Sequence, residues 1–311
     1  MSISQYIREI GRGRDGARSL SRVQAADLFG QVLDGSVTDL EVGAFCLAMR
    51  IKGESPQEMA GFLDATYQRL HRIPAPGQAV VVIPSYNGAR KLPVLTPLLA
   101  LLLAREGAPV LVHGTATESS RVDAAKVFAA LGIHARARVE PIAQGEVMFA
   151  PTALLCPGLQ RLLEVRRVVG LRNPGHSLVK LMNPVAGPSL IVSSYTHPEY
   201  AISMAAVFEL MQANALLMRG TEGEAVADPR RMPQMDGFIS GQRRQLQPAQ
   251  TGTLATLPDL PRDTHADSTA TYIREIMAGK FPVPAPIAQQ VEHILLLVSQ
   301  ITEPHPTTEA L

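Results

Sequence analysis

The segment AVVVIPSYNGARKLPVLTPLLALLLA, residues 79–104, predicts a strand, a loop and a helix in succession. The run Ala79–Ile83 is typical of a buried strand, because it is short, wholly apolar and rich in valine. The run Leu98–Ala104 is typical of a helix, with Thr96 as its N-cap and Pro97 at its first position. A strand that leads through a loop into a helix is the repeating unit of α/β proteins.

The loop of this unit, Ile83–Lys91, lies where a phosphate often binds in such folds. Backbone N–H groups without helical partners converge between the end of a strand and the start of a helix. The loop carries the basic pair Arg90-Lys91 and a single glycine, and it has no carboxylate to hold a metal ion. We therefore expect it to bind an anion without metal-assisted phosphate chemistry.

From residue 79 onward, short apolar runs alternate with helical patterns, which indicates an α/β sheet with mainly parallel strands. Residues 221–262 are rich in Gly, Pro, Gln and Thr, and they predict short antiparallel strands and long loops. A C-terminal helix is predicted over 287–301, and the tail 302–311 is expected to fray. The five runs that predict parallel strands are Val80–Ile83, Val110–Val112, Val147–Phe149, Leu190–Val192 and Ala215–Met218.

Residues 1–72 show only helical patterns. A third helix in this region has Thr38 or Asp39 as its cap, and a fourth begins at Ser55–Glu58, where a capping residue is followed by proline. The Pro/Gly-rich stretch Ile73–Gly77 is the clearest linker in the chain. The sequence therefore predicts a helical domain followed by an α/β domain.

The composition is that of a folded protein with a substantial core. Apolar residues make up 46% and charged residues 18% of the 311, and the net charge is +1, so any surface for nucleic acid must be local. Cys46 and Cys156 lie in apolar contexts without zinc spacing, and we expect buried free thiols. The longest apolar run is too short to cross a membrane, and the N-terminus lacks the core of a signal peptide. We expect a cytoplasmic protein without a membrane partner.

The segment GSVTDLEVGAFCLAMRIKGE, residues 35–54, resembles the helical domain of the anthranilate phosphoribosyltransferases of glycosyltransferase family 3. The resemblance implies a nucleoside phosphorylase/phosphoribosyltransferase-like fold, in which a small N-terminal helical domain precedes a larger α/β domain with a mainly parallel central sheet. It places the helical dimerisation domain at 1–72 and the α/β domain at 77–311, joined by a helical excursion around 160–185. Further similar motifs are His113-Gly114, Phe149–Pro151, Gly170–Asn173 and Asn183-Pro184.

The catalytic positions of this family differ here. The G-T-G-G-D loop, which wraps the pyrophosphate of phosphoribosyl pyrophosphate, falls on Pro84–Gly88, where a proline and a tyrosine prevent close backbone approach. The acidic motif that holds magnesium falls on Glu222–Val226, which lacks the paired carboxylates. The resemblance therefore implies a degenerate transferase with no catalytic residue, no metal site and no cofactor. The residues of its vestigial substrate cleft are Ser85, Asn87, Gly88, Thr96, His113, Gly114 and Arg172.

One divergent bacterial branch of the family, the YbiB-like proteins, shows the same departures. Resemblance to this branch implies a homodimer joined through the helical domains. It also implies binding of DNA or RNA without sequence preference. The motifs of the branch are I-P-S-Y-N-G-A-R-K, V-H-G, R-N-x-x-H, H-P-E-Y and G-T-E-G-E, which stand here at 83–91, 112–114, 172–176, 197–200 and 220–224.

A local basic surface for phosphates is present in the sequence. Residues 160–180 hold five cations against Glu164 alone, and the two former phosphate loops add three more. If these segments meet, they form a positive strip, and such a strip releases condensed counterions when it binds phosphates. The candidate nucleic-acid-binding residues are Arg161, Arg166, Arg167, Arg172, Lys180, Arg90, Lys91 and Arg121.

Other interpretations of the same residues stay open. Arginines spaced along a helix are usually a solvated face, and Arg172 lies where the enzymes hold an arginine near their aromatic substrate. Tyr86 is one candidate platform for base stacking, and Glu222 and Glu224 are candidates for a shifted metal site. Two other functions remain. One is a phosphoribosyltransferase with a rearranged, magnesium-dependent donor site and an unknown acceptor, and the other is a sensor of a small anion in the old cleft.

Overall fold

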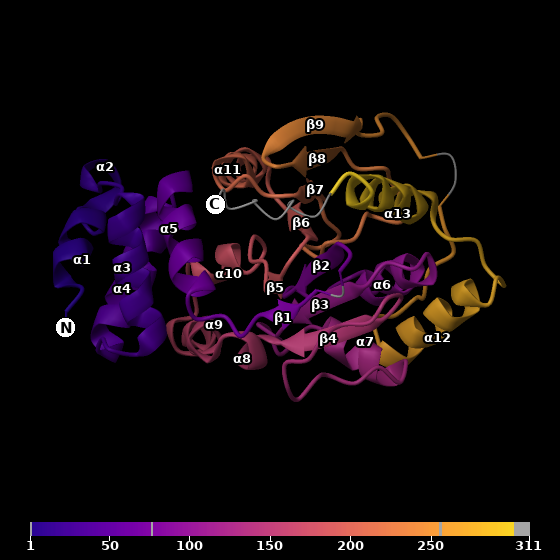
Figure 1. The fold of residues 1–311 in the computed structure, drawn as a ribbon, viewed down its shortest axis with the longest axis horizontal. Coiled ribbons are helices and arrows are strands. Elements are labelled where there is room, and N and C mark those ends of the chain that lie inside the picture. The colour runs from indigo at the N-terminus through magenta and orange to yellow at the C-terminus, as the bar shows by residue number, and fades with distance from the viewer. Residues whose placement is uncertain (1, 76, 255–256, 302–311) are drawn as a thin grey trace, which may run out of the picture.

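The computed structural model describes residues 2–75, 77–254 and 257–301. Figure 1 shows a helical part at one end of the molecule and a larger α/β part built on a sheet. This arrangement confirms the predicted fold class. The helices of the first part are α1 (Ser4–Ile10), α2 (Gly13–Gly16), α3 (Arg22–Asp34), α4 (Asp39–Lys52) and α5 (Pro56–Tyr67).

Three of these helices begin with reciprocal capping boxes, which explains why their starts are visible in the sequence. Ser21, Thr38 and Ser55 each accept a hydrogen bond from the backbone N–H three residues on. The side chain at that later position accepts the N–H of the cap in return. Of the two predicted caps for α4, the structure uses Thr38 and not Asp39.

The helical part closes around three phenylalanines. Phe29 stacks on Phe62 with ring centroids 4.6 Å apart, and Phe45 meets both rings edge-on. Cys46 lies in the same core, where burial raises the pKa of its thiol to about 12, and Cys156 is also a buried free thiol, as predicted. In the three described ranges, no helix combines the length and the apolar character needed to cross a membrane.

The α/β part is built on a seven-stranded sheet with the order β4-β3-β2-β6-β7-β8-β9. The first five strands in this order are parallel, and β8 and β9 add to one edge in antiparallel orientation. All five predicted runs form parallel strands, and the antiparallel pair lies within 221–262. The strands are β2 (Val80–Ser85), β3 (Val110–Gly114), β4 (Val147–Pro151), β6 (Ser189–Tyr195), β7 (Ala215–Arg219), β8 (Met235–Ile239) and β9 (Gln242–Gln247).

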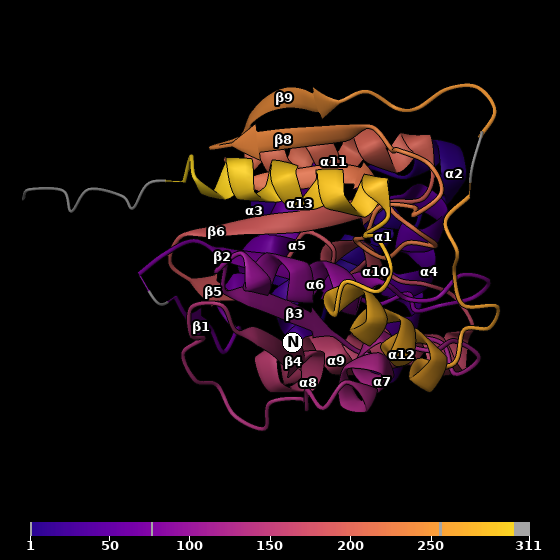
Figure 2. The same ribbon diagram turned by 90° about the vertical axis from the view of Figure 1, so that its right-hand side faces the viewer.

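Helices cover both faces of the sheet, because the strands carry apolar side chains on both sides. One face packs against α6, α7, α12 and α13, and Figure 2 shows α6 and α13 in front of the strands. The other face packs against α11 and is continuous with the core of the helical part. These helices are α6 (Thr96–Arg105), α7 (Ala124–Ala130), α11 (Pro198–Leu210), α12 (Ala266–Met277) and α13 (Ala285–Val298).

The two C-terminal helices differ in how visible they are in the sequence. The helix predicted over 287–301 is α13, which begins two residues earlier. No helix is predicted where α12 lies, and its N-cap residue His265 makes no side-chain capping bond. The tail 302–311, predicted to fray, lies outside the described residues.

Segments from the α/β part pack against the helical part and tie the two together. The helix α9 packs on α3, and α10 packs on α5. The two parts approach closely at Gly158, where a Cβ atom would lie 2.2 Å from the carbonyl oxygen of Leu33. The tying elements are α8 (Thr152–Leu155), α9 (Pro157–Val169), α10 (Gly175–Leu178) and the parallel pair β1 (Ile73–Pro74) and β5 (Val185–Ala186).

Candidate functional site

The parallel strands end at one edge of the sheet, and the loops that follow them build the candidate site. In open α/β sheets, ligands bind beyond the carboxyl ends of the strands. The loop after β2 contacts the loops after β3 and β7, which come from neighbouring parts of this edge. The last residues of the five parallel strands are Ser85, Gly114, Pro151, Tyr195 and Arg219.

The loop after β2 holds a carboxylate of the protein itself. Glu224, only 2% exposed, accepts hydrogen bonds from the hydroxyls of Ser85 (2.5 Å) and Thr96 (2.8 Å). Its second oxygen accepts the backbone N–H groups of Asn87 and Gly88, each at 2.8 Å. These are the groups that an anion would use at a helix N-terminus. These four residues, predicted to line a vestigial substrate cleft, have these donors bound to Glu224.

This arrangement also changes the predicted role of Thr96. The residue before α6 is Leu95, and it makes no side-chain cap. Thr96 is instead the first residue of the helix, and its hydroxyl is bound to Glu224. The prediction of a threonine N-cap is therefore wrong by one position: as a cap the hydroxyl would accept a backbone N–H, whereas here it donates to the carboxylate of Glu224.

A second carboxylate, that of Glu222, holds the other end of the same loop. It accepts the backbone N–H groups of Arg90 (2.5 Å) and Lys91 (2.9 Å). Between the two glutamates lies Gly223 at a φ of +94°, where a Cβ atom would lie 1.8 Å from Nδ2 of Asn87. Only glycine fits this left-handed position so close to a side chain. The two loops are therefore closed on each other.

The two glutamates do not fit the magnesium site that is considered as an alternative. Their carboxylate oxygens face N–H and O–H hydrogens, so a cation placed there would meet donors instead of acceptors. Across the described ranges, no group of three or more His, Cys, Asp or Glu residues is arranged to hold a metal ion. The donor set of this edge suits an anion.

Behind the loop lies a buried polar pair in place of an open cleft. The hydroxyl of Tyr86 is 2.9 Å from Nδ1 of His113 and accepts a hydrogen bond from Thr152. Burial lowers the pKa of His113 to about 3, so its imidazole is neutral at pH 7. Gly114 is equally enclosed, because a Cβ there would lie 1.9 Å from the carbonyl oxygen of Ser85. His113 and Gly114 therefore do not line a cleft, and Tyr86, 5% exposed, is not a stacking platform.

Beside the loop, three arginines share one carboxylate. Glu118 is 2.7 Å from Nη2 of Arg166, 3.2 Å from Nη2 of Arg172 and 3.1 Å from Nε of Arg121. Burial, together with the charge of Arg166, lowers the pKa of Arg172. With three positive charges on one negative charge, the arginine cluster keeps a net charge of +2.

The arginine cluster is continuous with the loop after β2. Arg121 donates to the carbonyl oxygen of Asn87, and Ala89 pairs with Val122 in an isolated β-bridge. These contacts place the exposed pair at 90–91 beside the cluster, while Arg167 extends it along α9. We call this surface the basic strip; its members are Arg90, Lys91, Arg121, Arg166, Arg167 and Arg172.

Two predicted nucleic-acid contacts, Lys180 and Arg161, donate to backbone carbonyl groups of the protein, Lys180 from a half-buried position and Arg161 from an exposed one. The ammonium group of Lys180 donates to the carbonyl oxygen of Gly223 at 3.0 Å, and burial lowers its pKa to about 8. Arg161 donates to the carbonyl oxygen of Leu33 at 2.8 Å, which joins α9 to α3. Both bonds satisfy backbone carbonyls at junctions between elements, so neither residue belongs to the basic strip.

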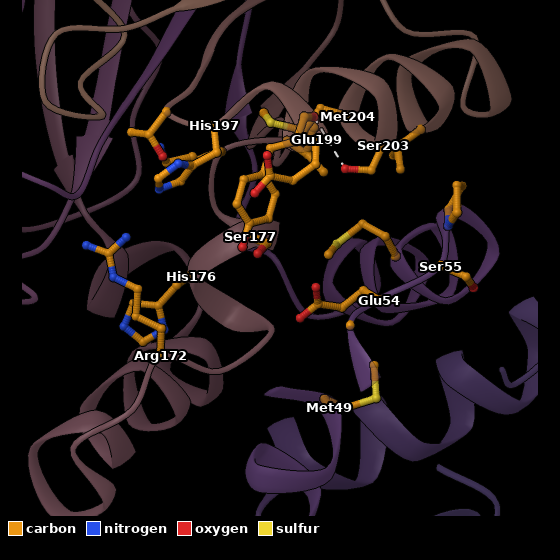
Figure 3. A pocket seen from close by; sticks show the side chains of 18 of the residues that line it. Met49, Glu54, Ser55, Arg172, His176, Ser177, His197, Glu199, Ser203 and Met204 are labelled. Carbon is orange, nitrogen blue, oxygen red and sulfur yellow. Dashed lines mark hydrogen bonds between the residues drawn. The ribbon is translucent and has the colours of Figure 1, made fainter. Parts of the chain in front are cut away.

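A cavity of about 560 Å³ lies between the helical part and the α/β part. Figure 3 shows Arg172 and His176 on one side of it and Met49 and Glu54 on the other. Burial, with the charge of Arg172, lowers the pKa of His176 to about 4. At pH 7 the imidazole of His176 is therefore neutral, and of these two side chains only Arg172 is charged. Met49 and Glu54 are not predicted as site residues, because no sequence pattern in or after α4 indicates which distant segment these residues face.

Comparisons with known proteins agree with this architecture. Residues 4–69 match the helical bundle domain of the glycosyl transferase family. Over 307 residues the chain is 38% identical to the uncharacterized protein YbiB of Escherichia coli, and the match covers 96% of this chain and 95% of YbiB. It is also 26% identical over 291 residues to an anthranilate phosphoribosyltransferase of Methylobacterium nodulans, covering 89% and 83% of the two chains. The chain belongs to the anthranilate phosphoribosyltransferase-like family, glycosyltransferase family 3.

Solved structures of this family share the fold. The anthranilate phosphoribosyltransferase of Thermus thermophilus matches with a TM-score of 0.66 at 21% identity, over 95% of this chain and 97% of that one. The Saccharomyces cerevisiae enzyme in complex with PRPP and Mg matches with a TM-score of 0.68 at 14% identity, over 96% and 89%. These likenesses confirm the predicted helical part and mainly parallel sheet.

The buried imidazole of His113 should make the protein sensitive to acid. In the unfolded chain its pKa is about 6.5, whereas in the folded protein burial lowers it to about 3. The stability that comes from the neutral form is therefore complete above pH 6.5 and is lost as the pH falls, by at most about 1.4 kcal/mol per pH unit. Urea unfolding at pH 7, 6 and 5 measures this loss. His113→Gln should flatten the pH dependence, while His265→Gln, at an exposed position, should leave it unchanged; equal slopes in the two variants would contradict this account.

Proposed function

We propose that this protein binds DNA or RNA through phosphate contacts, without reading the base sequence, and that it has lost phosphoribosyl transfer. The observation that carries the proposal is the basic strip, in which three arginines share Glu118 and are flanked by Arg90, Lys91 and Arg167. Glu118 pairs with three of the six cations of the strip, and Glu222 binds the backbone and not the side chains of Arg90 and Lys91. A surface of this kind releases condensed counterions when it meets phosphates, whatever their sequence.

The loss of transferase chemistry is supported by the loop after β2. Transfer from phosphoribosyl pyrophosphate requires positive or hydrogen-bonding groups that neutralise the pyrophosphate leaving group. In this protein the hydroxyl and backbone donors of the loop are bound to Glu224, and those at 90–91 are bound to Glu222. A rearranged donor site would have to expel both carboxylates and find other ligands for magnesium. We therefore propose that the chain is not an enzyme.

The mode of binding follows from which side chains the strip contains. Arginine holds phosphate oxygens with two parallel N–H bonds, and lysine holds them as a point charge. Such contacts fix a nucleic acid in place without reading its bases. Stacking is not part of the proposal, because Tyr86 is buried. We expect similar affinity for unrelated DNA and RNA, and a cytoplasmic location.

We further propose that two copies of the chain pair through the helical part. Helix α4 presents an apolar stripe to solvent: Leu40 is 84%, Leu47 47% and Ile51 57% exposed. These positions lie on one face of the helix, and an exposed apolar stripe of this kind marks a protein contact. A second copy is the occupant that resemblance to the YbiB-like branch implies. A dimer would present two basic strips to one long polyanion, which raises the effective concentration of the second strip.

Nucleic-acid binding should weaken steeply with salt. With about five phosphate contacts per copy, affinity for unrelated DNA and RNA should fall roughly 10²- to 10³-fold between 50 and 200 mM salt. Fluorescence anisotropy titrations measure this fall. The double variant Lys91→Glu/Arg167→Glu should lower affinity at least about tenfold for every sequence and reduce the salt slope, whereas Arg105→Glu, at the other end of α6, should change little. No binding at 50 mM salt, or affinity independent of salt, would refute the proposal.

The dimer should depend on the apolar stripe of α4. Light scattering of the purified chain at micromolar concentration should give the mass of two copies. Leu47→Glu/Ile51→Glu places two charges in the proposed contact and should give the mass of one copy. Ile202→Glu on α11, where the side chain is 76% exposed, should remain a dimer. If the double variant stays dimeric, the two copies pair through a surface other than the apolar stripe of α4.

A further inference from the structure

We infer that Glu224 is a tethered ligand: its carboxylate fills an oxyanion-binding site formed by four donors of the loop after β2 and the start of α6, and it keeps that site closed to anions from solution. This role does not rest on nucleic-acid binding, since it concerns the inside of the loop and not the basic strip. The ligand class that the site would take without Glu224 is a small inorganic oxyanion such as phosphate. The inference rests on the donors, on their burial and on the way the loop Thr221–Glu224 is held.

The donors converge on one point from separate elements. Ser85 ends β2, Asn87 and Gly88 follow it, and Thr96 begins α6. The successive backbone N–H groups of Asn87 and Gly88 both point at the same oxygen of Glu224, as in an anion-binding nest. The start of the ten-residue helix α6 adds its positive end. This set accepts an oxyanion, and in the native chain the oxyanion is a carboxylate.

Burial makes an acceptor at this point necessary. Ser85 is 6%, Asn87 8% and Thr96 0% exposed. Within the described residues, Glu224 is the acceptor for the hydroxyls of Ser85 and Thr96 and for the backbone N–H of Asn87. A buried donor that loses its partner keeps the full cost of its desolvation. Removing the carboxylate therefore leaves a site that is short of an acceptor and that an external oxyanion can complete.

The loop that carries Glu224 is fixed in place. The carbonyl oxygen of Gly223 accepts hydrogen bonds from Lys180 and from the hydroxyl of Ser194, each at 3.0 Å. Thr221 bonds to the backbone of Val226 through its own N–H and its hydroxyl. A carboxylate tethered in this way has a high effective concentration at the site. Millimolar phosphate therefore does not displace it from the native protein.

The test is rescue of Glu224→Ala by inorganic phosphate. In chloride, this variant should melt roughly 5–10 °C below the wild type. Replacing chloride with phosphate at equal ionic strength should recover at least half of that loss, whereas the melting temperature of the wild type should change by about 1 °C or less. Because phosphate on the basic strip would act on both proteins equally, the difference between them reports the loop. If the variant does not fold in chloride, its refolding yield in phosphate against chloride is the readout.

Two further variants make the result specific. Glu224→Gln keeps the bulk of the side chain, so it should lose stability without being rescued by phosphate. Asp236→Ala removes another buried carboxylate, which is bound by the side chains of Gln234 and Arg243 and not by backbone N–H groups; it should not be rescued either. The inference would be overturned if phosphate rescued Glu224→Ala no more than Asp236→Ala. It would also be overturned if Glu224→Ala were insoluble in both salts. A loss of DNA affinity in the strip variants with rescue intact would leave it standing.

Discussion

The carboxylate of Glu224 joins three segments that are far apart in the chain: the end of β2, the start of α6 and the loop after β7. Its partners are two backbone N–H groups and two hydroxyls, all of them buried. Because the acceptor is charged, each bond is stronger than one between neutral groups. Glu222 repeats the arrangement at 90–91. The edge of the sheet where ligands bind in α/β proteins is thereby closed by the protein itself.

This closure separates the inside of the edge from its rim. Inside, the hydroxyl and backbone donors of the loop are bound to Glu224. At the rim, Glu222 holds the backbone of Arg90 and Lys91 while their side chains stay exposed, and the arginines around Glu118 keep an excess of positive charge. A rim of this kind meets the backbone of a long polyanion and does not need a pocket. This division of the sheet edge is the basis of the proposal that the chain binds nucleic acid and does not transfer a phosphoribosyl group.

Much of the fold is visible in the sequence because local signals and tertiary structure agree. The five parallel strands are short apolar runs, and α3, α4 and α5 begin at capping boxes. Helix α12 has no such start, since His265 makes no capping bond, and it is missed. The arginines of α9 can be predicted as a basic segment, but their grouping cannot, because Glu118 lies 48 residues before Arg166.

The interior of the site is predictable only in part, for the same reason. The sequence predicts an anion-binding loop after β2 and shows that the glycines of the related enzymes are replaced there. It does not show that Glu224, 139 residues from Ser85, supplies the anion. Lys180 looks like a surface cation in the sequence, yet in the structure it is half-buried and donates to the backbone carbonyl of Gly223. Pairings of this kind depend on the packed fold and leave no local pattern.

The most direct test of the account is calorimetric titration of the wild-type protein with phosphoribosyl pyrophosphate in the presence of magnesium. The account predicts no saturable binding, because the donors that a pyrophosphate group would need are bound to Glu222 and Glu224. Weak heat that disappears at 200 mM salt would reflect contact with the basic strip and agrees with this prediction. Saturable, magnesium-dependent binding that persists at that salt concentration would contradict it.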